Sequence, residues 1–86
     1  LAAARAAHGP VTILVANAGA AETAPFQAFA FDAWRRLMAV NLDSLHHLAQ
    51  AALPDLQAAN HGRFIAIAST AGRKGYAYAT AYSAAK

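Results

Sequence analysis

Two short runs without polar alternation stand out along the chain, and a long amphipathic stretch separates them. The first run, residues 11–16, reads Val-Thr-Ile-Leu-Val-Ala, and the second, residues 63–68, reads Arg-Phe-Ile-Ala-Ile-Ala. Continuous runs of β-branched and apolar residues are typical of parallel strands that other elements cover on both faces. The pattern therefore predicts two buried strands.

The stretch between these runs predicts one long helix that begins at Phe31. Apolar side chains recur in it at helical spacing, and they are Trp34, Leu37, Met38, Leu42, Leu45, Leu48, Ala49, Ala52, Leu53 and Leu56. Asp32 is expected to cap its start, and Asn60-His61-Gly62 to end it. Pro54 lacks a backbone donor, so it is expected to kink the helix or to start a new turn.

Residues 1–7 are expected to be the end of a helix that precedes the first strand, and His8-Gly9-Pro10 is expected to stop it. A long helix that joins two such strands makes a crossover unit, which implies that the strands are parallel. The predicted fold class is therefore α/β, a Rossmann-like doubly wound parallel sheet of which two strands and their flanking helices are present.

Candidate chemistry gathers in the last eighteen residues of the chain. Ser69 follows the second run, at the carboxyl edge where open α/β sheets bind ligands. Tyr82 and Lys86 are four residues apart, so they share one face of a helix, which the alanine-rich composition favours. A neighbouring ammonium group favours the ionised form of a phenol, and this makes Tyr82 a candidate general acid.

Two further features lie earlier in the chain. The small residues of Asn17-Ala18-Gly19 end the first strand and allow a ligand or another backbone to approach closely, although an ordinary turn needs no more than this. Asn41 falls on the apolar stripe of the long helix. An unpaired buried amide would cost about 1 to 3 kcal/mol, so Asn41 either bonds the helix to the sheet or holds water at a site.

The order and spacing of these residues resemble the classical short-chain dehydrogenases/reductases. The matching features are Asn17-Ala18-Gly19 after a strand, Asn41 within a long helix, Ser69 thirteen positions before Tyr82, and the motif from Tyr82 to Lys86, Tyr-x-x-x-Lys. The resemblance implies an oxidoreductase that moves a hydride between NAD or NADP and a small secondary alcohol or ketone.

The resemblance also implies a role for each residue. Tyr82 would exchange a proton with the substrate oxygen, and Ser69 would orient and polarise that oxygen. Lys86 would favour the phenolate and hold the nicotinamide ribose, while Asn41 would support a proton relay through water. Asn17-Ala18-Gly19 would contact the cofactor together with Tyr82 and Lys86.

One position departs from the family pattern, since Ala16 stands where a second asparagine is usual, and this puts one hydrogen bond in doubt. Two other readings stay open. A non-catalytic protein could keep the Rossmann fold for binding or assembly, and an extended-type sugar-nucleotide epimerase or dehydratase shares Tyr-x-x-x-Lys. Asn17-Ala18-Gly19 and the placement of Asn41 favour the classical branch.

Composition narrows the remaining classes. The seven Lys and Arg residues form no stripe and the formal net charge is only +3, which argues against nucleic-acid binding. The chain has no cysteine, and the adjacent His46 and His47 diverge by about 100° on a helix, so no metal site is predicted. Neither a long apolar run nor a signal-like start occurs, so the default expectation is a cytoplasmic protein without a membrane span.

Residues 1–86 are expected to be the central and catalytic part of a single NAD(P)-binding Rossmann-fold domain that is truncated at both ends. An apolar fraction of 58% against 13% charged residues is typical of core strands and interface helices. The resemblance implies that the full-length protein forms a homodimer or homotetramer, with the helices around Leu45 to Leu56 and from Tyr82 onward at the subunit interface. The loop 73–80 offers a mildly basic rim, in which Tyr76 and Tyr78 are substrate-pocket or surface aromatics.

Overall fold

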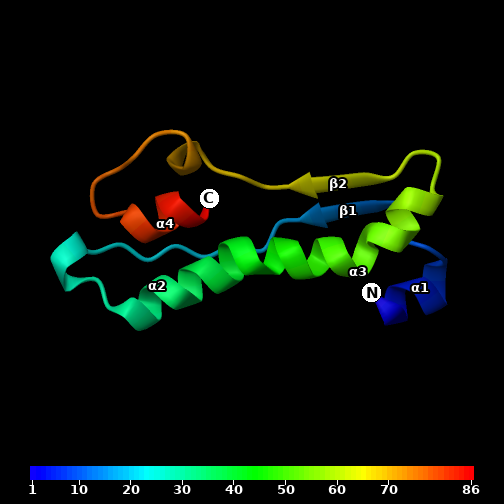
Figure 1. The fold of residues 1–86 in the computed structure, drawn as a ribbon, viewed down its shortest axis with the longest axis horizontal. Coiled ribbons are helices and arrows are strands. Elements are labelled where there is room, and N and C mark those ends of the chain that lie inside the picture. The colour runs from blue at the N-terminus through cyan, green and yellow to red at the C-terminus, as the bar shows by residue number, and fades with distance from the viewer.

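The structure is a computed structural model that covers residues 1–86. The molecule is elongated and measures 47 × 23 × 16 Å. Its elements are α1 (Ala2–His8), β1 (Ile13–Ala16), η1 (Phe26–Ala28), α2 (Phe31–Met38), η2 (Ala39–Asp43), α3 (Ser44–Ala58), β2 (Arg63–Ala66), η3 (Thr70–Gly72) and α4 (Thr80–Ala85). The short elements η1 and η3 are 3₁₀ turns, whereas η2 is a π-helical turn. Figure 1 shows α2, η2 and α3 as one rod along the molecule, with the strands beside one half of it and α4 beside the other.

The two strands form a parallel pair, with residues 13–16 of β1 opposite residues 63–66 of β2. The pairing continues one step further, because the N–H of Ile67 donates to the carbonyl of Ala16 at 3.0 Å. A parallel pair joined by a long helix is the predicted crossover unit. The α/β class of the fold is therefore confirmed.

Both strands are shorter than the apolar runs that predicted them. β1 begins at Ile13 rather than at residue 11, and the N–H of Val11 donates to the carboxylate of Asp55 at 2.9 Å. β2 ends at Ala66 rather than at residue 68. Ser69 consequently lies three residues beyond the last residue of β2.

The prediction that both faces of the strands are covered is wrong for this chain. Helix α3 contacts both strands, and along β1 every second residue is shielded from solvent: Leu14 is half-buried and Ala16 is buried. The intervening Ile13 and Val15 remain 60% and 51% exposed, and every residue of β2 is exposed. The uninterrupted apolar sequence is that of a sheet between two layers, and residues 1–86 supply only one of these layers.

The buried core consists almost entirely of alanines, which let helices and strands approach closely. Its apolar members are Ala16, Ala33, Leu37, Ala52, Ala71, Ala79, Ala81 and Ala85. Ala81 and Ala85 are four residues apart, so they form one face of α4, and α4 packs on α2. This packing fixes the position of the helix that carries Tyr82.

The long helix runs from Phe31 to Ala58 as predicted, but in three segments with the π-helical turn between α2 and α3. Asp32 is not its N-cap: Ala30 takes that position without a side-chain bond, and Asp32 lies in the first turn. A carboxylate there still meets the positive end of the helix. No new turn begins at Pro54 either, because α3 continues through it on an exposed side of the helix.

Two glycines stand at the ends of helices. Gly9 follows α1 with a φ of 84°, in the left-handed region that favours glycine, and its N–H donates to the carbonyl of Arg5 at 2.9 Å. Helix α1 thus ends at His8, one residue later than predicted, and Gly9 stops it. Gly62 lies after α3, where an added Cβ would collide with the carbonyl oxygen of Leu56.

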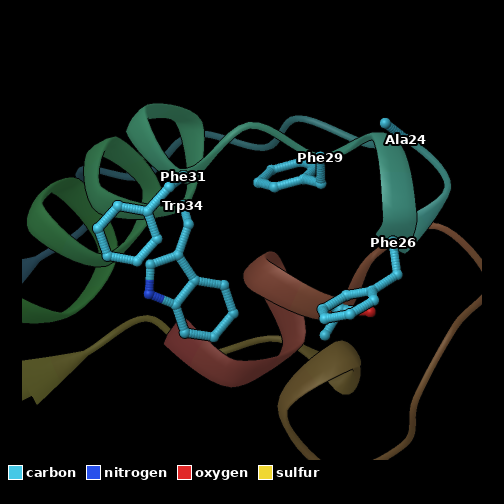
Figure 2. A pocket seen from close by; sticks show the side chains of 6 residues that line it. Ala24, Phe26, Phe29, Phe31 and Trp34 are labelled. Carbon is cyan, nitrogen blue, oxygen red and sulfur yellow. The ribbon is translucent and has the colours of Figure 1, made fainter.

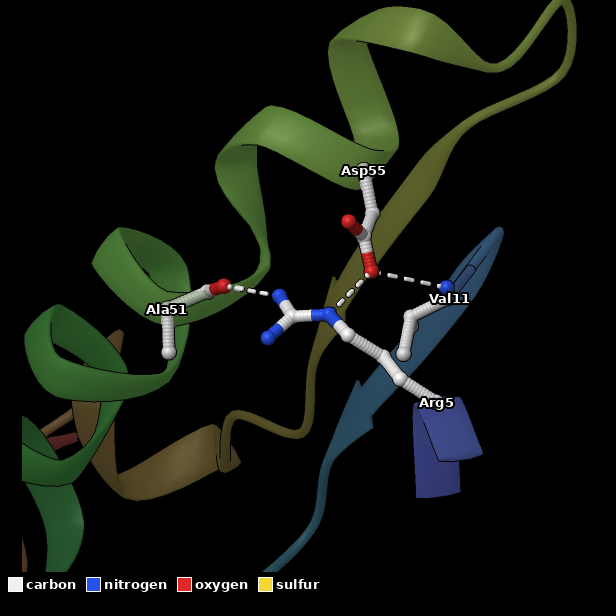
Figure 3. A network of polar contacts seen from close by, with 4 residues as sticks. All are labelled: Arg5, Val11, Ala51 and Asp55. Carbon is white, nitrogen blue, oxygen red and sulfur yellow. Dashed lines mark hydrogen bonds and ion pairs between the residues drawn. The ribbon is translucent and has the colours of Figure 1, made fainter. Parts of the chain in front are cut away.

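A polar clip ties α1, the start of β1 and α3 together (Figure 3). Arg5 donates from Nε to Asp55 Oδ2 at 2.7 Å and from Nη2 to the carbonyl of Ala51 at 2.6 Å. The same Asp55 oxygen accepts the N–H of Val11 at 2.9 Å. Two hydrogen bonds lower the pKa of the Asp55 carboxyl below its ordinary value of 3.8. The bond from Arg5 has the largest effect, and the bond from Val11 has the next largest.

Candidate active site

The residues singled out from the sequence belong to four elements that meet beyond the carboxyl ends of the strands. Asn17-Ala18-Gly19 leaves β1, Ser69 follows β2, Asn41 lies in η2, and Tyr82 and Lys86 belong to α4 and its end. In Figure 1 the segment after β1 passes between α4 and the long helix. Parallel strands bring their carboxyl ends to one edge, so chain segments far apart in sequence meet there.

Asn41 is the only buried polar residue of the chain, with 3% of its surface exposed. Its Oδ1 accepts the N–H of Ala20 at 3.1 Å, and its Nδ2 donates to the carbonyls of Ala20 at 2.8 Å and Leu37 at 2.9 Å. The amide therefore bonds the π-helical turn to the segment after β1, not to a strand. Its two donors are satisfied, while Oδ1 keeps one lone pair.

Gly19 brings Asn41 and Lys86 together. A Cβ built on Gly19 would lie 2.9 Å from Asn41 Oδ1 and 3.2 Å from Lys86 Nζ, so both side-chain ends reach the same point beside this glycine. The Lys86 ammonium also donates to the carbonyl of Ile67, just beyond β2, at 2.9 Å. Three segments that are distant in sequence thus converge on one spot at the edge of the sheet.

The loop after β2 is fixed against the end of α4. A Cβ on Gly72 would lie 2.5 Å from the carbonyl oxygen of Lys86, so only glycine fits this close approach. Ser69 has an extended backbone, and its Oγ accepts the N–H of Ala71 at 3.2 Å. The hydroxyl hydrogen of Ser69 has no acceptor within the chain, and it remains available to another group.

Tyr82 lies half-buried on α4, and Lys86 is four residues further along the same helix face, as predicted. The N–H of Lys86 donates to the carbonyl of Tyr82 at 3.0 Å, but no hydrogen bond joins the Tyr82 hydroxyl to the Lys86 ammonium or to Ser69; the ammonium bonds Ile67 instead. The neighbouring Ser83 has a buried Oγ without any hydrogen-bond partner. Ser83 was not predicted from the sequence. The backbone partners of the site were not predicted either, because a backbone contact does not depend on residue type.

An aromatic hollow of about 310 Å³ lies beside the start of α4 (Figure 2). Its lining residues are Ala24, Phe26, Phe29, Phe31, Trp34 and Thr80. Successive helical residues are about 100° apart, so Tyr82 points about 200° away from Thr80. The aromatic hollow therefore lies on a different side of α4 from the candidate catalytic tyrosine.

A second hollow, of about 330 Å³, follows Ser69 directly and is polar. It is lined by Thr70, Arg73, Lys74 and Tyr76. Elsewhere, no group of three or more His, Asp or Glu side chains is placed to hold a metal ion, and His46 and His47 meet edge to face with ring centres 5.7 Å apart. None of the helices combines the length and the apolar character that crossing a membrane requires.

The crossover of two parallel strands, with polar residues gathered at their carboxyl ends, defines a Rossmann-like α/β domain. The family model described as short chain dehydrogenase matches residues 1–86, and the chain belongs to this family.

Relatives and solved structures agree with this assignment. The chain is 40% identical over 78 residues to D-beta-hydroxybutyrate dehydrogenase of Cupriavidus necator, which covers 91% of this chain and 30% of that protein. It is 40% identical over 81 residues to (-)-trans-carveol dehydrogenase of Rhodococcus erythropolis, covering 91% and 29%. A gluconate 5-dehydrogenase from Burkholderia cenocepacia, solved with NADP and tartrate, superposes with a TM-score of 0.90 at 38% identity, covering 99% of this chain and 33% of that one. The chain therefore spans about a third of the length of these proteins.

Proposed function

We propose that the full-length protein is an oxidoreductase that transfers a hydride between NAD or NADP and a secondary alcohol or ketone. One observation carries the proposal: Gly19, Asn41 and Lys86 converge at the carboxyl edge of the sheet in a chain of the short-chain dehydrogenase family. The similar gluconate 5-dehydrogenase was solved with NADP, which supports the class of cofactor.

The segment after β1 fits a dinucleotide. Asn17, Ala18 and Gly19 are exposed and small, so a ligand can approach their backbone at the sheet edge. We assign these three residues, with Tyr82 and Lys86, to cofactor binding. When bound, NAD or NADP supplies the hydride chemistry, and the chain supplies placement and charge.

Tyr82 is assigned the proton transfer to and from the substrate oxygen. Its hydroxyl takes part in none of the side-chain hydrogen bonds within the chain, so it is free to bond a substrate. Lys86 uses one of its three N–H groups on the carbonyl of Ile67, so two remain for the nicotinamide ribose. Ser69, whose hydroxyl hydrogen is unused, orients and polarises the substrate oxygen.

Asn41 is assigned a supporting role beside Lys86. Its carboxamide holds the backbone of Ala20 on both sides, which fixes the adjoining Gly19. The remaining lone pair of Oδ1 can hold a water molecule next to Lys86 Nζ, since both atoms lie near one point. Such a water would link the ammonium to solvent and so support proton exchange.

The test compares two tyrosine variants of the full-length protein in a spectrophotometric NAD(P)H assay. Tyr82→Phe is expected to lower kcat by about a hundred- to ten-thousand-fold, because the proton donor is lost, and to change the KM for NAD(P)H far less, because Asn17-Ala18-Gly19 and Lys86 still hold the cofactor. Tyr78→Phe removes the same oxygen from a side chain that is 62% exposed, and it is the matched control. A Tyr82→Phe enzyme with ordinary turnover would rule out the mechanism.

The two other readings give different results with the unmodified protein. A non-catalytic binding protein would bind NAD(P)H but oxidise no secondary alcohol. A sugar-nucleotide epimerase or dehydratase would convert its substrate without net change in NAD(P)H.

We also propose that the full-length protein assembles as a homodimer or homotetramer through the outer face of the long helix. Leu42 and Leu53 are eleven positions apart on this helix, so they share one face, and they are 42% and 49% exposed, an apolar surface that a second copy could cover. Leu53→Glu is expected to shift sedimentation toward the monomer, whereas Gln57→Glu changes the charge of an exposed residue on the same helix and serves as control. A purely monomeric unmodified protein at micromolar concentration would refute the assembly.

A further inference from the structure

The polar hollow after β2 is fixed beside the candidate active site. It begins at Thr70, directly after Ser69, and Thr70 is the first residue of η3. The last residue of the same turn, Gly72, packs against the carbonyl of Lys86 at the end of α4. The hollow therefore adjoins the segment that carries Ser69, and the turn from which it begins packs against the end of α4.

Two hydroxyl groups and two cations line this hollow. Tyr76 donates from its hydroxyl to Thr70 Oγ1 at 3.2 Å, which orders one wall. The ammonium of Lys74 lies 5.9 Å from the centre of the Tyr76 ring. Arg73 and Lys74 are exposed, and neither takes part in either of the ion pairs of the chain, which join Arg5 to Asp55 and Arg36 to Glu22.

Both charged residues that line the hollow are basic, as is every charged side chain that follows Asp55 in the sequence. The chain has four acidic residues, Glu22, Asp32, Asp43 and Asp55, and none of them follows Asp55. Four bases do follow it, and they are Arg63, Arg73, Lys74 and Lys86. The segment after Asp55, which carries Ser69, Tyr82 and Lys86, therefore has only basic charged side chains, and such a segment attracts anions.

We infer that Arg73 and Lys74 bind an anionic oxygen group of the substrate, so that the protein acts on hydroxy or oxo acids rather than on neutral alcohols. This inference rests on the proposed dehydrogenase function and adds the class of substrate. The guanidinium of Arg73 presents a planar fork that matches a carboxylate, and Lys74 adds a second positive charge. The hydroxyls of Thr70 and Tyr76 supply further hydrogen-bonding groups on the same wall.

A phosphate group of the cofactor has the same chemistry as a substrate anion, and position separates the two sources. The cofactor is assigned to Asn17-Ala18-Gly19, Tyr82 and Lys86, whereas Arg73 and Lys74 lie on the loop beyond Ser69. Ser69 is the residue assigned to the substrate oxygen. The anion in the hollow is therefore expected to belong to the substrate.

The experiment titrates 3-hydroxybutyrate and its methyl ester, by calorimetry, into the full-length protein saturated with NADH, with which an alcohol cannot react, and repeats the titration with NADPH. Arg73→Gln and Lys74→Gln together are expected to weaken acid binding about five- to tenfold or more, and to leave ester binding and cofactor affinity unchanged. Arg63→Gln removes an exposed charge at the opposite end of β2, where the guanidinium bonds only the carbonyl of Gly62, and it is the matched control.

Each other outcome decides against the inference. Equal affinity of the unmodified protein for acid and ester, or an equal loss for both ligands in the double variant, removes the anion site. If the double variant binds only the cofactor more weakly, and not the acid, the hollow is assigned to the cofactor. Binding is measured without turnover, so an inactive protein that still prefers the acid through Arg73 and Lys74 would refute the dehydrogenase function and keep the anion site.

Discussion

Replacing Gly19 by alanine tests the convergence on which the proposed active site depends. The added Cβ would lie 2.9 Å from Asn41 Oδ1, closer than such carbon atoms approach a neighbour in folded proteins. It would also lie 3.2 Å from Lys86 Nζ. The ammonium is the far end of a flexible side chain and can move, but Asn41 is buried and held by three hydrogen bonds.

The size of the effect follows from these bonds. Moving Asn41 aside weakens its bonds to Ala20 and Leu37, and each bond contributes about 0.5 to 1.5 kcal/mol to stability. Moving the backbone of Gly19 instead disturbs Ala20, which is bonded to Asn41 at both its N–H and its carbonyl. Overpacking of this kind typically costs about 1 to 3 kcal/mol, and we expect Gly19→Ala to lower the free energy of unfolding by that amount.

Chemical denaturation of the full-length protein at one protein concentration measures this change. Gly75→Ala is the matched control, because a Cβ on Gly75 meets nothing within 4 Å. That variant is expected to be neutral or to stabilise the protein by up to about 1 kcal/mol, since alanine restricts the unfolded chain. Lys86 is also displaced in Gly19→Ala, so the KM for NAD(P)H should rise in this variant and not in the control.

A double-mutant cycle identifies the clash. Asn41→Ala removes Oδ1, so the Cβ of Gly19→Ala then fits, and the double variant should lose less stability than the two single variants added together. An additive cycle, or a Gly19→Ala protein as stable as Gly75→Ala within about 0.5 kcal/mol, would show that Gly19 and Asn41 do not meet as the structure describes.

Three further predictions concern stability. Ser83→Ala removes a buried hydroxyl without a partner, so denaturation should show an unchanged or higher stability; a loss above about 1 kcal/mol would reveal a partner outside residues 1–86. Because the pKa of Asp55 is lower in the folded protein, its carboxylate stabilises the fold above pH 3.8, and this contribution is lost as the pH falls through the folded-state pKa. In acid titrations, the stability of Asp55→Asn should therefore depend less on pH in this range than that of the unmodified protein. Gly62→Ala drives a Cβ into the carbonyl of Leu56 and should cost about 1 to 3 kcal/mol, unlike Gly75→Ala.

The sequence alone determined the elements of this protein and their order. Period and composition located α1, the two strands and the long helix, because helices and strands depend on local patterns of apolar side chains. The spacing from Tyr82 to Lys86 placed both on one face of α4 for the same reason. The family, too, was recognisable from the order and spacing of its motifs, since each motif is a short run of residues that can be read directly from the sequence.

Only the tertiary structure decided how these elements meet. Backbone atoms take part in the three hydrogen bonds of Asn41, in the bond from Lys86 to Ile67 and in the close approach at Gly19. Every residue has the same backbone groups, so the pattern of side chains along the sequence does not predict which of them will be bonded. The pairing of Arg5 with Asp55 joins residues fifty positions apart, and many other pairs of opposite charge were possible. The cover of β1 depends on which layers are present, because an apolar strand has the same sequence whether one face or both are packed.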